Sequence, residues 1–246
     1  MSEPIKGRAL IIAMTKFHSR SRASPNVLGR RKGVTRDTKR LFKALSHLGY
    51  KVTLQEDVSA KEIREIYQKE SRMPQGECFI SILSSHGEEG LIYDFYGEPV
   101  FLRDLYDILS PRNSPALAGI PKLFFIQACR GKDFDEGVVV ETDSASCETF
   151  SHSWSIPSDT VVMFASSEGY VAFQNPIGSV FLQTLCDIME GEGRYLELSQ
   201  IFTRISYNVA YKFQSRGLYE GYKEMPCYIT NLTQQLWPFR HLGNAR

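Results

Sequence analysis

Two short motifs place a reactive side chain directly after an apolar run. Cys129 lies in K-L-F-F-I-Q-A-C-R-G, from Lys122 to Gly131, and His86 lies upstream in I-S-I-L-S-S-H-G. An imidazole next to a thiol accepts or relays the thiol proton and so favours the nucleophilic thiolate. Glycines that follow each residue let the backbone turn sharply and point N–H groups at a developing negative charge. A single cysteine or histidine at a strand end is more often structural, but the two motifs together predict catalysis by a thiol.

Short apolar runs alternate with helical patterns along the chain. Strands buried on both faces are expected at Arg8–Met14, Tyr50–Gln55, Cys78–Leu83, Leu123–Ala128 and Thr160–Ala165, with a last strand at Cys227–Leu232. Helices are expected at Thr35–Leu48, after the cap Ser59, and roughly at Gly178–Glu190 and Leu196–Phe213, with a hairpin over Leu91–Phe101. This alternation predicts βαβ units, hence an α/β fold with a largely parallel sheet. In such sheets the reactive crevice lies beyond the carboxyl ends of the strands, where His86 and Cys129 are expected.

The composition is that of one compact globular fold. Of the 246 residues 42% are apolar and 23% are charged, and no apolar run approaches the roughly 20 residues that span a bilayer. The N-terminus lacks the basic-then-apolar layout of a signal peptide, so a cytoplasmic protein without a membrane partner is expected. Five cysteines at irregular spacings argue against a disulfide framework and a zinc site; they are Cys78, Cys129, Cys147, Cys186 and Cys227.

Basic residues are concentrated in the first fifty residues, although the net charge is only +1. No aromatic interleaving or binding motif accompanies them, so nucleic-acid binding is not predicted. A solvated helix face accounts for Arg36, Lys39, Arg40 and Lys43, and a binding role stays open for the loop from Arg20 to Lys32. The segment from Lys132 to Ser155 is acidic, rich in Ser and Thr and without periodicity. It is predicted to be an exposed loop that is open to proteolysis.

Motifs over nearly the whole chain resemble those of the caspases. They are S-S-H-G-E-E-G, the Q-A-C-R-G signature, an E-T-D-S linker, a G-S-x-F-x-Q-x-L helix and M-P-C-Y-I-T-N-L. The similarity is greatest to short-prodomain executioner caspases. It implies a three-layer sandwich with a mostly parallel six-stranded sheet flanked by helices. It also implies a short N-terminal segment (1–7), a large subunit (8–143), the rest of a linker (144–155) and a small subunit (156–246).

The resemblance implies a role for each residue that matches a family motif. Cys129 is then the nucleophile, His86 the general base and acid, and the backbone amides of Gly87 and Cys129 the oxyanion hole. The reaction is cleavage of a protein after aspartate, the P1 residue, through a thioester, and no metal or cofactor is implied. The family holds the P1 carboxylate with two arginines and a glutamine, of which Arg31 in R-K-G and Gln127 match two.

The second arginine is replaced in this chain. The segment from Gly169 reads G-Y-V-A-F-Q-N, which puts Gln174 before Asn175 at the arginine position. A neutral amide forms weaker bonds than a guanidinium, so cleavage after aspartate should be about ten- to a hundredfold weaker. A shifted local register, with Gln174 an ordinary loop residue, is the alternative. Val171, Phe173 and Val180 stand where larger aromatics are common, which predicts altered S2 and S4 pockets.

Maturation and assembly are also implied by the resemblance. Asp143 in V-E-T-D-S matches the site at which executioner caspases are cut by an initiator-type protease, and Asp133 and Asp135 are weaker candidates. The strand Cys227–Leu232 is expected to pair with its copy in a homodimer. The main prediction is a caspase-like endopeptidase in apoptosis or related proteolytic signalling. The alternative is a weakened relative that binds and regulates caspases, which Gln174 favours. An arginine-specific relative would need an acidic pocket, which the R-R-K loop disfavours.

Overall fold

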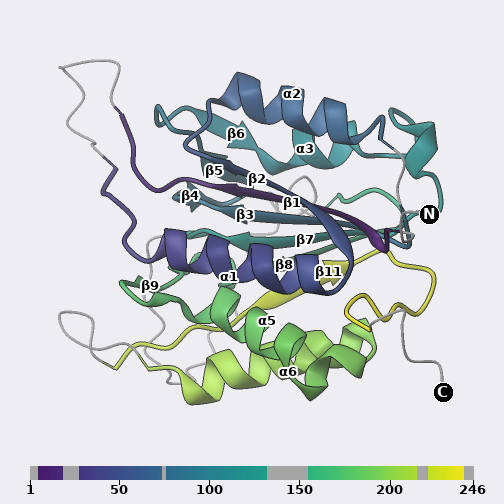
Figure 1. The fold of residues 1–246 in the computed structure, drawn as a ribbon. Coiled ribbons are helices and arrows are strands. Elements are labelled where there is room, and N and C mark those ends of the chain that lie inside the picture. The colour runs from purple at the N-terminus through teal and green to yellow at the C-terminus, as the bar shows by residue number, and fades with distance from the viewer. Residues whose placement is uncertain (1–4, 19–27, 74–75, 132–154, 215–220, 241–246) are drawn as a thin grey trace, which may run out of the picture.

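A six-stranded sheet forms the centre of the molecule (Figure 1). The computed structural model describes residues 5–18, 28–73, 76–131, 155–214 and 221–240. The strand order is β11-β8-β7-β3-β1-β2, and neighbours pair in parallel except for β11 and β8, which are antiparallel. The strands are β1 Gly7–Ala13, β2 Tyr50–Glu56, β3 Phe79–Ser84, β7 Lys122–Gln127, β8 Thr160–Phe164 and β11 Cys227–Thr230.

Helices cover both faces of this sheet (Figure 1). One face carries α2 and α3, and the other carries α1, α5 and α6. Successive residues of a strand point to opposite faces, so Phe124 packs into the core on the α2 side while Phe125 packs into the core on the α1 side. The predicted three-layer α/β sandwich is confirmed. The helices are α1 Val34–His47, α2 Ala60–Glu70, α3 Leu102–Ile108, α5 Val180–Glu190 and α6 Leu198–Lys212.

The predicted elements agree with the structure except at the sheet edges. Burial on both faces is wrong for β2, whose residues after Tyr50 are half-buried or exposed, because β2 is an edge strand. The last strand stops at Thr230, two residues before the expected end. The cap at Ser59 is present as a capping box with Glu62 at the start of α2.

Short elements add a hairpin and a small sheet beside the main one. The expected hairpin is present as β5 (Leu91–Tyr93) and β6 (Pro99–Phe101), and β4 (Gly87–Glu88) extends it to three strands. Two further strands, β9 (Gln174–Asn175) and β10 (Gly178–Ser179), form a second hairpin that puts Gln174 opposite Ser179. Neither β4 nor this second hairpin was predicted, because two residues are too few to show a period.

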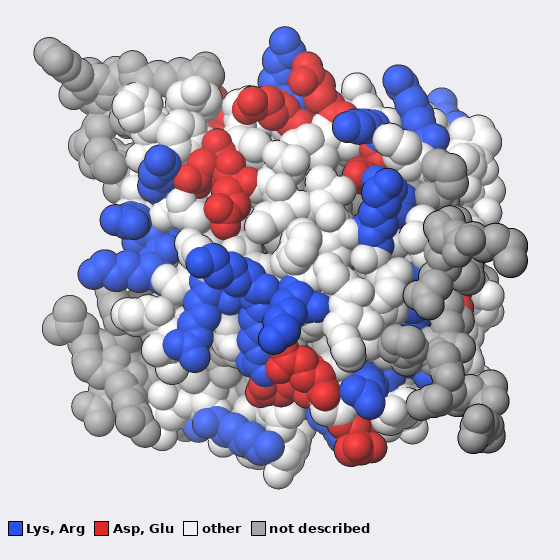
Figure 2. Space-filling view, viewed as in Figure 1, with Lys and Arg blue, Asp and Glu red and all other residues white. Residues whose placement is uncertain are grey.

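Basic side chains gather over α1 (Figure 2). Arg36, Lys39 and Lys43 are exposed on this helix, as expected of a solvated face. Arg40 instead turns to α5, where its guanidinium lies 2.6 Å from carboxylate oxygens of Asp187 and Glu190. Two further exposed cations, Arg30 and Lys32, directly precede α1.

The outer edge of β11 has no strand partner within the described chain. Tyr228 on this strand is 41% exposed and its ring lies on that of Phe202. Among the described helices, none combines the length and apolar character needed to cross a membrane. The predicted processing residue Asp143, its weaker alternatives Asp133 and Asp135, and nearly all of the predicted linker lie outside the described residues.

Candidate active site

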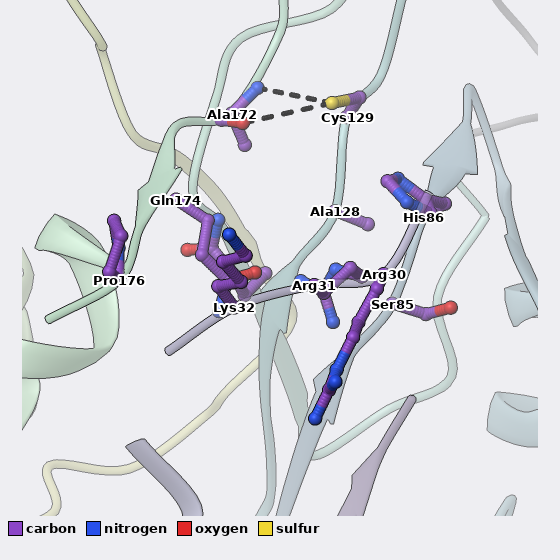
Figure 3. Close-up of a pocket in the computed structure, with 11 residues that line it drawn as sticks. Arg30, Arg31, Lys32, Ser85, His86, Ala128, Cys129, Ala172, Gln174 and Pro176 are labelled. Atoms are coloured by element: carbon purple, nitrogen blue, oxygen red, sulfur yellow. Dashed lines mark hydrogen bonds between the residues drawn. The ribbon is translucent and has the colours of Figure 1, made fainter. Parts of the chain in front are cut away.

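The carboxyl ends of β3 and β7 bring the two motifs together. The strands are adjacent and parallel, and Ser84 pairs with Gln127 at their last rung. His86 and Cys129 each lie two residues beyond that rung. The backbone N–H of Ser85 donates to the Gln127 carbonyl at 3.1 Å, which holds the two strand ends in this register. Both side chains face one cavity of about 370 Å³ (Figure 3), lined by Arg30, Arg31, Lys32, Ser85, His86, Gln127, Ala128, Cys129, Ala172, Gln174 and Pro176.

The Cys129 thiol is half-buried and contacts the backbone of Ala172 (Figure 3). The Ala172 N–H donates to Sγ at 3.5 Å, and Sγ lies 3.8 Å from the Ala172 carbonyl oxygen. Burial raises the pKa of the thiol above its ordinary value, and the bond from Ala172 and the charge of Arg31 oppose this only in part. In this arrangement the thiol is protonated at neutral pH, and residue 172 lies over the sulfur.

The His86 ring is fixed by a backbone carbonyl and an aromatic ring. Its Nε2 lies 3.1 Å from the Gly29 carbonyl oxygen, and its centroid lies 4.9 Å from that of Phe17. A carbonyl oxygen only accepts hydrogen bonds, so Nε2 carries the proton and Nδ1 of the neutral ring holds a free lone pair. Burial lowers the pKa of His86 and the nearby Arg31 charge adds to this, although the Gly29 bond acts in the other direction. The imidazole is therefore neutral at pH 7 and has the form of a base.

Gly87 lies where a side chain does not fit. A Cβ on this residue would come within 2.6 Å of the Leu91 carbonyl oxygen, 3.0 Å of the Ala128 Cβ and 3.3 Å of the Cys129 carbonyl oxygen. Glycine thus lets the backbone after His86 pass directly against the segment that carries the thiol.

Arg31 is a buried cation at the wall of the cavity. The residue is 8% exposed, and its Nη1 donates to the Met14 carbonyl oxygen at 3.0 Å and to Ser84 Oγ at 3.1 Å. No carboxylate bonds to it within the described chain. Burial lowers the pKa of Arg31 to about 10, so the guanidinium stays charged at neutral pH. The nearby charge of Asp37 acts on the guanidinium without a direct bond. A buried charge to which no carboxylate of the described chain bonds is costly, and an anionic ligand in the cavity would offset that cost.

The two glutamines of the cavity are oriented by oxygen atoms. Gln127 Nε2 donates to the Phe173 carbonyl at 3.4 Å, and Gln174 Nε2 donates to Asp37 Oδ2 at 3.4 Å. Because an oxygen faces each amide nitrogen, the orientation of both carboxamides is set. Their Oε1 atoms are buried without a hydrogen-bond partner among the described residues.

Comparisons with known proteins identify the family. A family model for the caspase domain matches residues 6–237. The chain belongs to the caspase family. It is 35% identical to caspase-7 of Gallus gallus over 242 residues, covering 94% of this chain and 76% of that protein. It is 32% identical to caspase-3 of Bos taurus over 244 residues, covering 96% and 86%. The crystal structure of caspase-1 from Spodoptera frugiperda superposes with a TM-score of 0.80 at 28% identity, covering 94% and 90%.

Membership of the caspase family gives the general chemistry. Caspase-domain proteins are cysteine peptidases of apoptosis or inflammation that act on proteins after aspartate. Within the described chain, no group of three or more His, Cys, Asp or Glu side chains is arranged to hold a metal ion.

Five of the expected site residues line the cavity: Arg31, His86, Gln127, Cys129 and Gln174. Val171 and Phe173 do not line it, and Val180 begins α5 and packs against the core. Their expected roles in the S2 and S4 pockets stay predictions, as does that of Asn175, whose side chain is outside the described part of the structure.

Several residues of the site carried no signal in the sequence. Lys32, Ala172 and Pro176 line the cavity, although none of them was assigned a role of its own from the sequence. The backbone of Phe173 is held from both sides, since Gln127 bonds its carbonyl and Glu224 accepts from its N–H at 2.6 Å. Glu224 is 1% exposed, and burial raises its pKa to about 8. Its Oε1 is buried without a partner among the described residues.

We expect Glu224→Gln to change how stability depends on pH. The folded state holds a proton on Glu224 up to about pH 8, whereas the unfolded chain releases it near the ordinary pKa of 4.5. Between these values the group makes the free energy of unfolding fall with rising pH, by up to about 1.4 kcal/mol per unit. The measurement is urea unfolding of both proteins at pH 5, 6.5, 8 and 9. The free energy of unfolding of the variant, relative to that of the wild type, should rise with pH up to about pH 8 and stay constant above it.

A surface control separates this effect from loss of a charge. Glu192→Gln removes a carboxylate from an exposed position. If both variants shift the unfolding curves alike at every pH, the burial of Glu224 does not determine the pH dependence.

Proposed function

We propose that this chain is a cysteine endopeptidase that cleaves proteins after aspartate. One observation carries the proposal: the buried Arg31 guanidinium, with no bonded carboxylate within the described chain, lines the same cavity as Cys129 and His86. A substrate carboxylate that enters this cavity offsets a buried positive charge and lies beside the thiol. Of the described residues that line the cavity three are basic and none is acidic, so an anionic side chain is favoured there.

The positions of the groups support the following reaction. Nδ1 of His86 takes the thiol proton, and Cys129 Sγ attacks the carbonyl carbon of the peptide bond. The N–H groups of Gly87 and Cys129 stabilise the oxyanion that forms. The imidazolium then gives its proton to the leaving amine, which departs and leaves a thioester. Water, deprotonated by the same ring, hydrolyses the thioester, releasing the new carboxyl end and restoring the thiol.

The described arrangement is not yet that of an active site. The thiol and the imidazole have the neutral forms from which the reaction starts, but the Ala172 backbone lies against the sulfur, with its N–H 3.5 Å from Sγ. Activation therefore requires residues 169–175 to move away from Cys129. We assign this to cleavage of the linker after Asp143 by an upstream protease, because the linker joins β7, which precedes Cys129, to β8, which precedes the moving segment. The unpaired edge of β11 supports a homodimer in which this strand pairs with its copy.

A library of peptides varied at P1 tests the proposal. Purified protein, cut after Asp143, should cleave peptides after aspartate and leave asparagine and alanine peptides largely intact. The Cys129→Ala variant serves as the blank and should show no cleavage. Cleavage after aspartate that persists in Cys129→Ala, or thiol-dependent cleavage that ignores P1, would reject the proposal.

A second function is favoured by Gln174, which brings no charge to the cavity. The chain would then bind and regulate other caspases without cutting substrates itself. The same library decides between the two. If the wild type equals the Cys129→Ala blank while Gln174→Arg cleaves after aspartate, the regulator is correct, because the rest of the machinery is then intact.

A further inference from the structure

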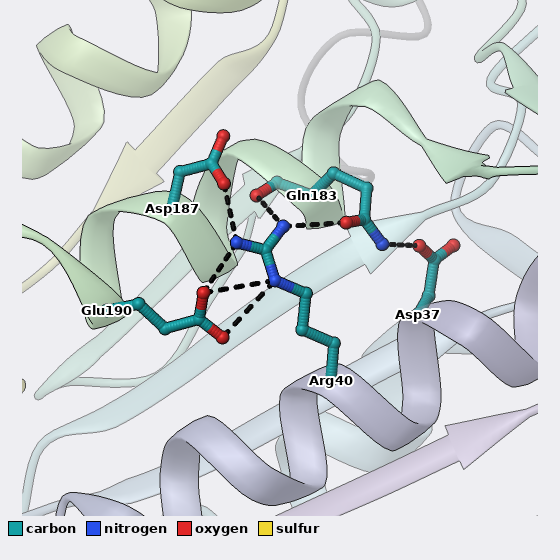
Figure 4. A network of polar contacts seen from close by, with 5 residues as sticks. All are labelled: Asp37, Arg40, Gln183, Asp187 and Glu190. Atoms are coloured by element: carbon teal, nitrogen blue, oxygen red, sulfur yellow. Dashed lines mark hydrogen bonds and ion pairs between the residues drawn. The ribbon is translucent and has the colours of Figure 1, made fainter.

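Gln174 brings no charge to the cavity, and its amide nitrogen is bonded to a carboxylate of α1. Its amide nitrogen faces Asp37, a buried carboxylate that also accepts from the Ser179 N–H at 2.9 Å and from Gln183 Nε2 at 2.5 Å. Figure 4 shows Asp37 and Gln183 joined in this way, with Gln183 extending the contact to Arg40. One N–H of Gln174 is used on Asp37, and its Oε1, an acceptor without a partner among the described residues, repels a carboxylate. One N–H of Gln127 is likewise used, on the Phe173 carbonyl.

Among the described residues that line the cavity, the basic side chains come from one short segment, residues 30–32. Arg31 forms the buried wall, and Arg30 and Lys32 on either side of it are exposed. In Figure 3 the side chain of Lys32 projects across Gln174 toward the side where Ala172 meets Cys129. Arg30 projects in the opposite direction, away from the thiol. All three side chains line the cavity that holds the thiol, but only that of Arg30 points away from the thiol (Figure 3).

We propose that Lys32 is the second cation that binds the substrate carboxylate, together with Arg31, and so determines the specificity at P1. This inference rests on the proposed function and names the residue that supplies the charge which position 174 lacks. Arg31 offers a rigid fork at the base of the cavity and Lys32 a mobile ammonium at its mouth. An ammonium on a flexible stem follows a carboxylate over a range of positions. Discrimination between aspartate and glutamate at P1 is accordingly weak.

The test compares variants at residues 30 and 32 on peptide pools with a fixed P1 residue. The pools X-X-X-Asp, X-X-X-Glu and X-X-X-Asn carry a fluorogenic leaving group, and the protein is the full chain cut after Asp143. Lys32→Ala should lower kcat/KM for the Asp and Glu pools by about tenfold or more and leave the Asn pool within about threefold. Lys32→Arg should retain most of the activity. Arg30→Ala is the matched control, because it removes one neighbouring positive charge that points away from the thiol.

Two results would overturn the inference. One is an equal effect of Lys32→Ala and Arg30→Ala, which shows that only the general positive potential matters. The other is a parallel loss on the Asp and Asn pools, which shows a structural role of Lys32.

A binding measurement separates this inference from the proposed function. Fluorescein-labelled X-X-X-Asp peptides are titrated with the Cys129→Ala protein, with and without Lys32→Ala, and followed by anisotropy. If the wild type cleaves no pool but Cys129→Ala binds aspartate peptides in a Lys32-dependent way, proteolysis is rejected and the carboxylate site stands. If the wild type cleaves after aspartate and Lys32→Ala cleaves equally well, the function stands and Lys32 is rejected. Absence of binding in both proteins rejects the carboxylate site.

Discussion

Arg31→Met is expected to lower kcat/KM for cleavage after aspartate by about a hundred- to ten-thousandfold. The reason is the loss of two charge-assisted bonds to the substrate carboxylate, each worth about 1.5–3 kcal/mol in a site shielded from water. Peptides with asparagine at P1 make only neutral bonds and should lose much less. The measurement is kcat/KM on matched aspartate and asparagine peptides, where the change in their ratio reports the charge.

A structural effect of Arg31→Met has to be separated from this loss. Arg31 also donates to the Met14 carbonyl and to Ser84 Oγ at the end of β3, so the variant leaves two buried acceptors without a donor. Thermal unfolding of each variant measures that contribution. Arg31→Lys keeps the charge but not the fork, and should retain part of the aspartate preference. If kcat/KM falls equally for the aspartate and asparagine peptides while the melting temperature is unchanged, Arg31 does not bind the substrate carboxylate.

Much of the fold was predictable because each strand and helix leaves its pattern in a continuous stretch of sequence. The five apolar runs are long enough to show strands, and their alternation with helical patterns allows few topologies other than a parallel sheet. That topology by itself places His86 and Cys129 at one sheet edge. The burial of β2 was misjudged because Y-K-V-T-L-Q-E was grouped with the continuous apolar runs, although its alternation of apolar and polar residues is typical of a strand covered on one face.

The pocket was less predictable because its residues meet only through the tertiary structure. Gln174 was recognised as the position that lacks a charge, but Asp37, to which its amide nitrogen is bonded, lies far away in the sequence, in α1. Lys32 was seen in a basic cluster whose members the sequence cannot distinguish, and the structure separates it from Arg30 by direction (Figure 3). Glu224 is an isolated acid in the sequence, and its role depends on its burial and on its bond to the Phe173 N–H, which only the tertiary structure shows.

Asp37→Ala should give the largest loss of stability among single changes near the site. Asp37 is fully buried in α1 and bonds to the Ser179 N–H and to Gln183 Nε2 (Figure 4). Removing the carboxylate leaves these buried donors unpaired, at about 1–3 kcal/mol each. We expect a loss of about 2–4 kcal/mol, seen as a melting temperature lower by about 5–15 °C. Activity should fall as well, because Asp37 ties β10 and Gln174 to α1.

Asp187→Ala is the matched control for this prediction. Asp187 also forms an ion pair in the network, with Arg40 at 2.6 Å, but its side chain is 65% exposed, so its loss should cost less than about 1 kcal/mol. The loss of stability in Asp37→Asn should lie between those of Asp37→Ala and Asp187→Ala, since asparagine keeps one acceptor oxygen and replaces the other by a donor. Gly178→Ala should resemble Asp37→Ala, because its φ of 117° strains any side chain and its Cβ would collide with Asp37 Oδ1. If the melting temperature of Asp37→Ala instead equals that of Asp187→Ala, the buried carboxylate does not hold the hairpin of β9 and β10 in place. Gln174 is then free to turn its amide nitrogen toward the substrate.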